Sequence, residues 1–336
     1  MIDLDSHLME PRDYLLPFAP ASLSEQLTMA GAPSRDEMIA GSAGQWSTPG
    51  AFDRSERRAL LDRLGIQRQV VLPGISHVAH LGTLRAVESA RAQHRAATAW
   101  ADGDPRFCPA AVIPMDHPGD ALDLIGDAAD DGFRLVLMTS GRSQPVPPNH
   151  PAQARIWHAL AESGLVGVLH FGTTGAGLSK SWRTLDAEVG DDAADPMDVV
   201  VAHHGVETMI ARMALSGMLG REQAPKLLLA EHGAGWLPGF LTSLDACQRA
   251  FRRLDPLIPQ GEPLSAQVRR AITVVPFAFE PVGDLIDRIG PDVLGFATDH
   301  PHPEGGRDPV ATFGDALGTR DSSAFFNENG TRLLDR

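Results

Sequence analysis

Cysteine is scarce in this sequence of 336 residues, which contains only Cys108 and Cys247. The two lie far apart in the chain and lack the C-x-x-C spacing of redox-active or metal-binding thiols. Small secreted proteins that depend on disulfides use cysteine far more densely, so that class is excluded. We expect two reduced, buried thiols in a cytoplasmic protein.

Basic residues are also in short supply, because 29 Lys and Arg against 43 Asp and Glu give a net charge of −14. Phosphate backbones repel an acidic chain, and no run of Lys and Arg provides a local exception. The apolar runs fall short of the roughly 20 residues that span a bilayer. The first residues lack the basic and apolar regions of a signal peptide. We therefore expect a soluble, cytoplasmic protein that acts on a small molecule, with neither nucleic acid nor membrane as partner.

Short apolar runs recur along the chain and alternate with helical patterns. This alternation predicts βα units and a parallel sheet, and the apolar character of the runs suits strands covered on both faces. Eight such runs are enough to close a (β/α)₈ TIM barrel, which forms one domain at this chain length. The predicted strands are Met1–Asp5, Gln69–Leu72, Ala110–Pro114, Arg134–Met138, Val166–His170, Lys226–Ala230, Ala271–Val275 and Val293–Ala297.

The segments between these runs divide into helices and loops. Leu15–Phe52, rich in Pro, Gly, Ser and Met, follows the first strand and has no clear periodicity. In a barrel such an excursion lies at the C-terminal face, so we expect residues 15–52 to form a lid or substrate-pocket loop. Gly172–Pro196, after the fifth strand, has the same interpretation. Helices are expected at Ser55–Leu64, Leu81–Asp102, Asp198–Leu219 and Pro238–Leu254.

Metal-ligating side chains stand at the ends of four predicted strands, where barrel enzymes keep their catalytic residues. The first strand ends in Asp5-Ser6-His7, and strand alternation points Asp5 and His7 the same way. His170 ends the fifth strand, and His232 and Asp299 follow the sixth and eighth. Each alone is commonly a hydrogen-bonded or capping residue. Together they predict a site for a divalent metal, and the mixture of imidazole and carboxylate suits Zn²⁺, Mn²⁺ or Fe²⁺.

Four motifs resemble those of the amidohydrolase-related family, a branch of the amidohydrolase superfamily that includes aminocarboxymuconate semialdehyde and γ-resorcylate decarboxylases. Ile2–Pro11 resembles the opening motif and Ala230–Pro238 the sixth-strand signature. Ala297–Gly305 is similar to the Asp-aromatic-Pro-His motif of the eighth strand, and Phe326–Leu334 to the closing helix. The resemblance covers nearly the whole chain and implies an amidohydrolase-like barrel with one tightly held divalent metal.

The resemblance also implies a role for each candidate residue. Asp5 and His7 match the first-strand ligands, His170 the fifth-strand ligand and Asp299 the eighth-strand carboxylate. His232 matches a histidine that serves relatives as base, electrostatic anchor or ligand. Two positions depart from the pattern: Asp5 stands where relatives have His or Glu, and the residue after Asp299 is His300 rather than an aromatic.

Further imidazoles leave open a second metal. His204-Gly205-Val206-Glu207 resembles a His-x-x-Glu found in many relatives, and on a helix His204 and Glu207 share one face. Such a pair can ligate an ion, as the reversed order does in di-iron proteins. The alternative is a surface helix on which these side chains bond to each other. His203 lies on the same stretch, and His77 and His80 follow the second strand.

Three reactions remain open. The first is hydrolysis of a small organic acid, ester or amide by metal-activated water, with Asp299 or His232 accepting the proton. The second is hydroxylation of a terpenoid-like intermediate by a non-haem di-iron monooxygenase. The resemblance implies this reaction for a few members of the family, and it would need two Fe in the site. The third is non-oxidative decarboxylation of an aromatic or enoic acid. A non-enzymatic protein that binds metal only as a scaffold is the less favoured alternative, because it would not explain so many imidazoles at the strand ends. By resemblance, and because such oligomers are common, we expect a homodimer.

Overall fold

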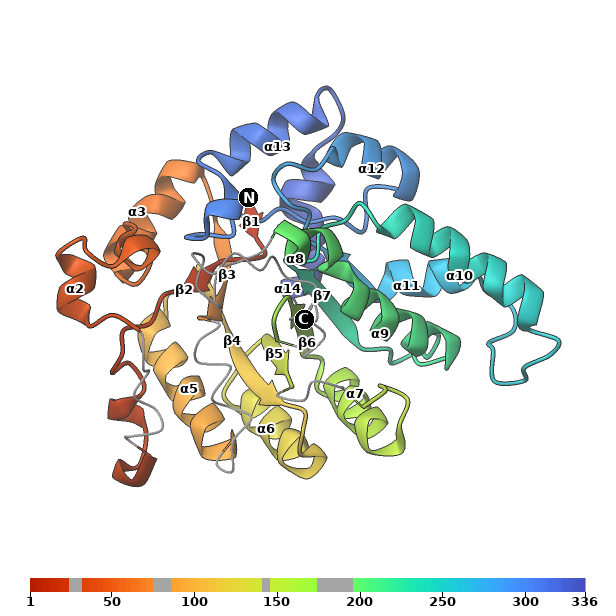
Figure 1. Ribbon diagram of the computed structural model, residues 1–336, viewed down its shortest axis with the longest axis horizontal. Coiled ribbons are helices and arrows are strands. Elements are labelled where there is room, and N and C mark those ends of the chain that lie inside the picture. The colour runs from red at the N-terminus through yellow and green to blue at the C-terminus, as the bar shows by residue number, and fades with distance from the viewer. Residues whose placement is uncertain (24–31, 75–85, 141–145, 174–195, 336) are drawn as a thin grey trace.

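The computed structural model describes residues 1–23, 32–74, 86–140, 146–173 and 196–335. Parallel strands occupy the centre of the molecule and helices surround them (Figure 1). The strands are β1 (Ile2–Asp3), β2 (His7–Leu8), β3 (Arg68–Pro73), β4 (Phe107–Pro114), β5 (Leu135–Thr139), β6 (Val166–His170), β7 (Lys226–Ala230) and β8 (Ile272–Val274). The alternation of strand and helix confirms the predicted (β/α)₈ barrel.

The first predicted strand is split into two short pieces. β1 and β2 both pair in parallel with β3, and residues 4–6 interrupt the ladder between them. The predicted strand Met1–Asp5 therefore began before β1 and ended before β2. From β3 to β8 each strand pairs with the next along the chain.

The eighth predicted strand, Val293–Ala297, closes the ring without forming a regular ladder. On one side Leu294 makes an isolated bridge with Val274 of β8. On the other, the Leu4 amide donates to the Phe296 carbonyl. The Phe296 amide donates instead to the Phe325 carbonyl, near the end of the chain. Because this donor is directed away from the sheet, the segment occupies a strand position with isolated pairing rather than a continuous ladder.

The helices form an outer layer around the strands (Figure 1). α3 (Arg54–Leu64) begins after the N-cap Asp53, whose side chain accepts from the Ser55 and Glu56 amides, and is terminated by Gly65 in the left-handed conformation. The other helices of the layer are α5 (Ala86–Ala101), α6 (Pro118–Asp130), α7 (Pro151–Ser163), α8 (Pro196–Val201), α9 (His203–Leu215), α10 (Leu237–Phe251), α11 (Leu264–Ala271), α12 (Val282–Ile289) and α13 (Pro309–Leu317).

The helix predicted over Asp198–Leu219 is divided in two. Ala202 separates α8 from α9, and its carbonyl accepts a hydrogen bond from the His232 ring. α9 ends at Leu215, short of the predicted end. The predictions at Ser55–Leu64 and Pro238–Leu254 agree with α3 and α10. Of Leu81–Asp102, the described part forms α5.

Two apolar clusters make up the core. The larger lies between the strands and the outer helices, and the smaller fills the barrel interior with side chains such as Leu4, Val70 and Val168. Leu333 and Leu334 of α14 (Asn329–Leu334) join the interior cluster. A filled interior leaves the C-terminal ends of the strands as the place for chemistry.

The excursion after the first strand contains short helical turns rather than an unstructured loop. These are η1 (Leu16–Phe18), η2 (Ala21–Leu23), α2 (Arg35–Ile39) and η3 (Gly44–Ser47). The segment returns to the barrel where the Met9 amide donates to the Ala51 carbonyl. Its role as a lid stays a prediction. Most of the second predicted loop, Gly172–Pro196, lies outside the described residues. In the described part, no helix combines the length and apolar character needed to cross a membrane.

Candidate metal centre

The turn between β1 and β2 places Asp5 and His7 inside the molecule. Ser6, between them, points elsewhere and donates to the Val70 carbonyl at 2.6 Å. The fully buried guanidinium of Arg57 donates to the His7 carbonyl at 2.6 Å and to Gln69 Oε1 at 3.1 Å. These bonds fix the backbone that carries both side chains, so the donors are positioned by the fold rather than by each other.

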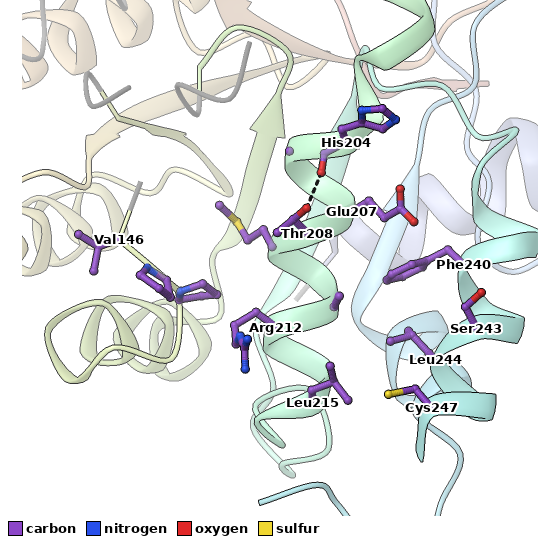
Figure 2. Close-up of a pocket in the computed structure, with 15 residues that line it drawn as sticks. Val146, His204, Glu207, Thr208, Arg212, Leu215, Phe240, Ser243, Leu244 and Cys247 are labelled. Atoms are coloured by element: carbon purple, nitrogen blue, oxygen red, sulfur yellow. Dashed lines mark hydrogen bonds between the residues drawn. The ribbon is translucent and has the colours of Figure 1, made fainter. Parts of the chain in front are cut away.

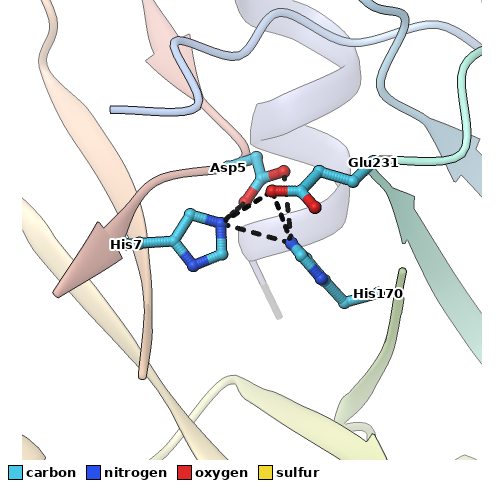
Figure 3. A group of neighbouring side chains, drawn as sticks. All are labelled: Asp5, His7, His170 and Glu231. Atoms are coloured by element: carbon cyan, nitrogen blue, oxygen red, sulfur yellow. Dashed lines mark hydrogen bonds and ion pairs between the residues drawn. The ribbon is translucent and has the colours of Figure 1, made fainter. Parts of the chain in front are cut away.

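Four side chains from three strand ends converge in this region (Figure 3). His7 Nε2 lies 3.5 Å from Asp5 Oδ1 and 3.3 Å from Glu231 Oε1. His170 Nε2 lies 3.3 Å from the same Glu231 oxygen and 3.2 Å from His7 Nε2. The potential ligand atoms of Asp5, His7, His170 and Glu231 all lie within 4.8 Å of one another. This spacing is compatible with the ligand shell of one cation.

A second group of donors overlaps the first. His302 Nδ1 donates to both Glu231 Oε1 and Asp299 Oδ1, each at 3.0 Å. Asp299 Oδ1 lies 3.5 Å from His7 Nε2, and the rings of His7 and His302 stack at 4.1 Å. The ligand atoms of His7, Glu231, Asp299 and His302 again lie within 4.8 Å of one another. His7 and Glu231 therefore belong to both groups.

Two of these carboxylates sit on strained backbone. Glu231 has φ 55° and Asp299 has φ 52°, the left-handed region that non-glycine residues rarely adopt. Each such residue costs on the order of 1–3 kcal/mol and persists only where its surroundings enforce it. After Glu231 the turn is held by Glu280, whose carboxylate accepts from the amides of Ala234 and Gly235. Strain at two neighbouring donors is typical of a functional site.

The electrostatics of the cluster follow from burying carboxylates beside imidazoles. Burial opposes a charge on His170 and on His302, but Glu231 and a second carboxylate beside each outweigh it. The pKa of His170 rises to about 9 and that of His302 to about 11. Burial and the neighbouring His302 lower the pKa of His7 to about 3, while burial raises that of Asp299 to about 7. The carboxylates thus require positive charge close by.

A divalent cation fits this requirement. Asp5 is fully buried, and neither of its carboxylate oxygens accepts a hydrogen bond from the described residues. A buried carboxylate without donors is costly unless a cation neutralises it. The donor set combines imidazoles with carboxylates, which suits Zn²⁺, Mn²⁺ or Fe²⁺. The residues present therefore fit the predicted divalent metal.

His232 lies beside these groups without belonging to them. Its Nδ1 donates to the Ala202 carbonyl at 2.8 Å, and its Nε2 is buried with no hydrogen-bond partner among the described residues. Burial lowers the pKa of His232 to about 4. The ring is therefore neutral near pH 7, with a lone pair available on Nε2.

The structure does not bring His204 and Glu207 to the donor groups. Both line a separate cavity of about 740 Å³ whose lining comes from α9, α10 and residues 146–148, with side chains such as Phe240 and Cys247 (Figure 2). Glu207 Oε2 lies 3.7 Å from His203 Nε2, and the His203 ring stacks on Trp236. In the described part of the chain no third donor joins them in a metal-binding group. Among the described residues the pair therefore stays apart from the donors at the strand ends.

The outcome for the remaining candidates is mixed. Asp5, His7, His170 and Asp299 come together as the sequence predicts. Glu231 and His302 were missed as donors, although Glu231 precedes His232 in the sixth-strand motif and His302 ends the Asp-x-Pro-His motif. His77 and His80 lie outside the described residues.

Comparisons with known proteins agree with this architecture. The model of a family described as amidohydrolase matches residues 2–336. No curated protein matches the chain. Among solved structures, an amidohydrolase from Mycobacterium avium subsp. paratuberculosis is 20% identical with a TM-score of 0.74, the alignment covering 99% of this chain and 98% of that one.

Two decarboxylases are similar in fold. A 5-carboxyvanillate decarboxylase from Novosphingobium aromaticivorans, complexed with manganese, is 17% identical with a TM-score of 0.71, covering 100% of this chain and 96% of that one. A 2,6-dihydroxybenzoate decarboxylase from Rhizobium is 17% identical with a TM-score of 0.67, covering 99% and 98%. At these identities the likeness shows the fold alone. The family match and the donor cluster together support a divalent metal, without fixing its identity.

Proposed function

Because the chain belongs to the amidohydrolase family, we propose that it is a metal-dependent hydrolase of a small, uncharged carbonyl compound such as an ester or amide. The observation that carries the proposal is a proton acceptor, Nε2 of His232, which has no hydrogen-bond partner among the described residues and lies beside a donor group that fits a divalent cation. Hydrolysis needs both parts: a means of activating water and a group to take its proton.

Asp5, His7, His170 and Glu231 would hold the cation. When bound, a divalent cation of this kind lowers the pKa of water toward ~7 and polarises a carbonyl oxygen. The Arg57 clamp on the His7 carbonyl and the Glu280 clamp after Glu231 keep the protein donors in place. Burial of the donors excludes bulk water and strengthens the electrostatic interactions among them.

His232 is the acceptor we assign to the water proton. Its Nδ1–H is fixed on the Ala202 carbonyl, so Nε2 is the acceptor nitrogen. As the water oxygen bonds to the carbonyl carbon, its proton passes to Nε2, which then returns it to the departing alcohol or amine. Asp299, with its pKa raised to about 7 by burial, is a second acceptor, but its Oδ1 already accepts from His302.

The proton acceptor ranks hydrolysis above decarboxylation, the activity in the names of two similar structures. Hydrolysis needs a group that takes the proton of the attacking water, and Nε2 of His232 can do so. With a single cation bound, the carboxylates of Asp5, Glu231 and Asp299 would also exceed its charge and disfavour an acidic substrate.

Oxygenation is the second candidate, and the size of the donor set favours it. Six side chains, three of them imidazoles, exceed what one catalytic cation uses. A pair of irons would suit a non-haem monooxygenase that hydroxylates an apolar, terpenoid-like compound. Such a reaction consumes O₂, two protons and two electrons from an external reductant such as a reduced iron–sulfur protein, placing one oxygen in the C–H bond and the other in water.

Turnover assays with defined metals test the proposal. The protein, freed of metal and reloaded with Zn²⁺, Mn²⁺ or anaerobic Fe²⁺, is offered neutral esters and amides, aromatic acids, and an apolar terpenoid with O₂ and reductant. We expect ester or amide cleavage, reduced about 10²–10⁴-fold in His232→Gln with unchanged metal content. CO₂ release from an acid, or O₂ uptake coupled to hydroxylation, in the absence of ester or amide cleavage would reject the hydrolase.

A further inference from the structure

The two donor groups of the metal centre share His7 and Glu231 and differ in their other two members. Asp5 and His170 belong only to the first group, while Asp299 and His302 belong only to the second. Glu231 belongs to both, and a single oxygen, Oε1, lies 3.3 Å from His170 Nε2 and 3.0 Å from His302 Nδ1. A carboxylate placed between two sets of ligands in this way has the arrangement of a bridging ligand.

The number of donors exceeds the need of one cation. A catalytic zinc site uses three protein ligands and keeps a position open for water or substrate. If all six side chains bound one ion, its coordination shell would be full and no substrate could reach it. Divided between two ions about 3.5–4 Å apart, the same six leave open positions on each.

The charge balance points the same way. The carboxylate of Asp5 is fully buried and those of Glu231 and Asp299 are mostly buried, and both oxygens of Asp5 lack a hydrogen-bond donor among the described residues. One divalent cation leaves this cluster with net negative charge in a poorly solvated place, which is costly. Two divalent cations neutralise the three carboxylates and leave a net positive charge that can polarise a substrate.

The shared hydrogen bond of His302 marks the place of the second ion. One Nδ1–H is divided between Glu231 Oε1 and Asp299 Oδ1. These three atoms are ligand types that Zn²⁺, Mn²⁺ and Fe²⁺ accept, and an ion exchanged for the shared proton would be bound by all of them.

We propose that the centre holds two divalent cations: one bound by Asp5 and His170, the other by Asp299 and His302, with Glu231 bridging them. His7, whose single Nε2 lone pair serves one ion, completes one of the two shells. This inference deepens the proposed function, on whose metal centre it rests. It replaces the second site predicted at His204 and Glu207 with one built on the barrel itself.

Metal stoichiometry is the direct test. Metal-free protein, purified after chelation, is titrated with Mn²⁺ and with anaerobic Fe²⁺, and bound metal is counted by elemental analysis after gel filtration. We expect two ions per chain in the wild type and one in His302→Ala or His302→Gln. Two Mn²⁺ ions that share a carboxylate are magnetically coupled, so the wild-type EPR spectrum should be that of a pair, and the variants' that of an isolated ion.

His204→Ala and Glu207→Ala are the matched controls, because they remove donors of the same types from α9. Both should keep two ions and the paired spectrum. The proposal is overturned if the wild type binds one ion, or if the α9 variants lose an ion while the folded His302 variants, checked by circular dichroism, keep both. One ion with ester or amide cleavage would spare the proposed function, whereas two ions without it would reject that function alone.

Discussion

Glu231 and His302 reach each other from two different strand ends, with Oε1 of Glu231 3.0 Å from Nδ1 of His302. Glu231 follows β7, and His302 belongs to the turn after the segment that closes the barrel.

The first prediction concerns this contact between Glu231 and His302. Glu231→Gln removes the charge shared by both donor groups, so metal affinity should fall by at least about tenfold at each site. Isothermal titration with Mn²⁺ measures it, and Glu207→Gln, which removes an α9 carboxylate, should leave both affinities unchanged.

The sequence predicted several strands of the barrel closely because their apolar runs are bounded on both sides. Val166–His170 and Lys226–Ala230 agree with β6 and β7 residue for residue. Glu231 was missed because the resemblance assigned the sixth-strand role to the neighbouring His232, and the sequence does not show which of the two side chains enters the donor group. The position of His204 and Glu207 could not be predicted either, because helical spacing tells which residues share a face but not which face meets the barrel.

The second prediction concerns Arg57, whose buried guanidinium donates to Gly50, His7 and Ala51 carbonyls. Arg57→Met leaves the Gly50 and His7 carbonyls without this donor, while the Ala51 carbonyl keeps the Met9 amide, so the free energy of unfolding should fall by about 3 kcal/mol or more. Urea denaturation measures the change. The control is Arg58→Met, which breaks a partly exposed pair with Asp104 and should cost less than about 1 kcal/mol. Equal losses in the two variants would contradict the structural role of Arg57.

The third prediction concerns pH and the buried carboxyl of Glu10. Burial raises the pKa of Glu10 from 4.5 to about 8, although the Gly74 amide donates to it. The folded protein therefore retains a proton that the unfolded chain releases, so this group lowers stability progressively as pH rises from about 4.5 to 8. Glu10→Gln keeps an acceptor for Gly74 and cannot ionise. Urea midpoints should show the variant gaining on the wild type over that range, and a constant difference between pH 5 and 8.5 would reject the assignment.

The fourth prediction concerns assembly. We propose a homodimer, since closed two-fold pairs are the commonest soluble oligomers. Exposed apolar side chains at and after the end of α10, those of Phe251, Leu254 and Leu257, are 50%, 77% and 79% exposed and provide a surface for association. Sedimentation velocity at micromolar protein should give one dimeric species. A single monomeric species would reject the dimer, and an unaltered dimer in Leu254→Asp/Leu257→Asp would place its interface elsewhere.

The last prediction separates the two halves of the metal centre through the backbone alone. A Cβ at Gly305 would overlap the carbonyl oxygen of Thr298 and lie 3.2 Å from Asp299 Cβ. Gly305→Ala must therefore shift the turn that carries Asp299 and His302, while Asp5 and His170 stand on other strands. We expect this variant to retain one tightly bound ion and to lose the second, as counted by elemental analysis after gel filtration. Gly314→Ala in α13, where an added Cβ meets nothing within 4 Å, is the control and should keep both. If a folded Gly305→Ala protein binds two ions with wild-type affinity, the turn does not position the second site, and if it binds none, the two sites do not fill independently.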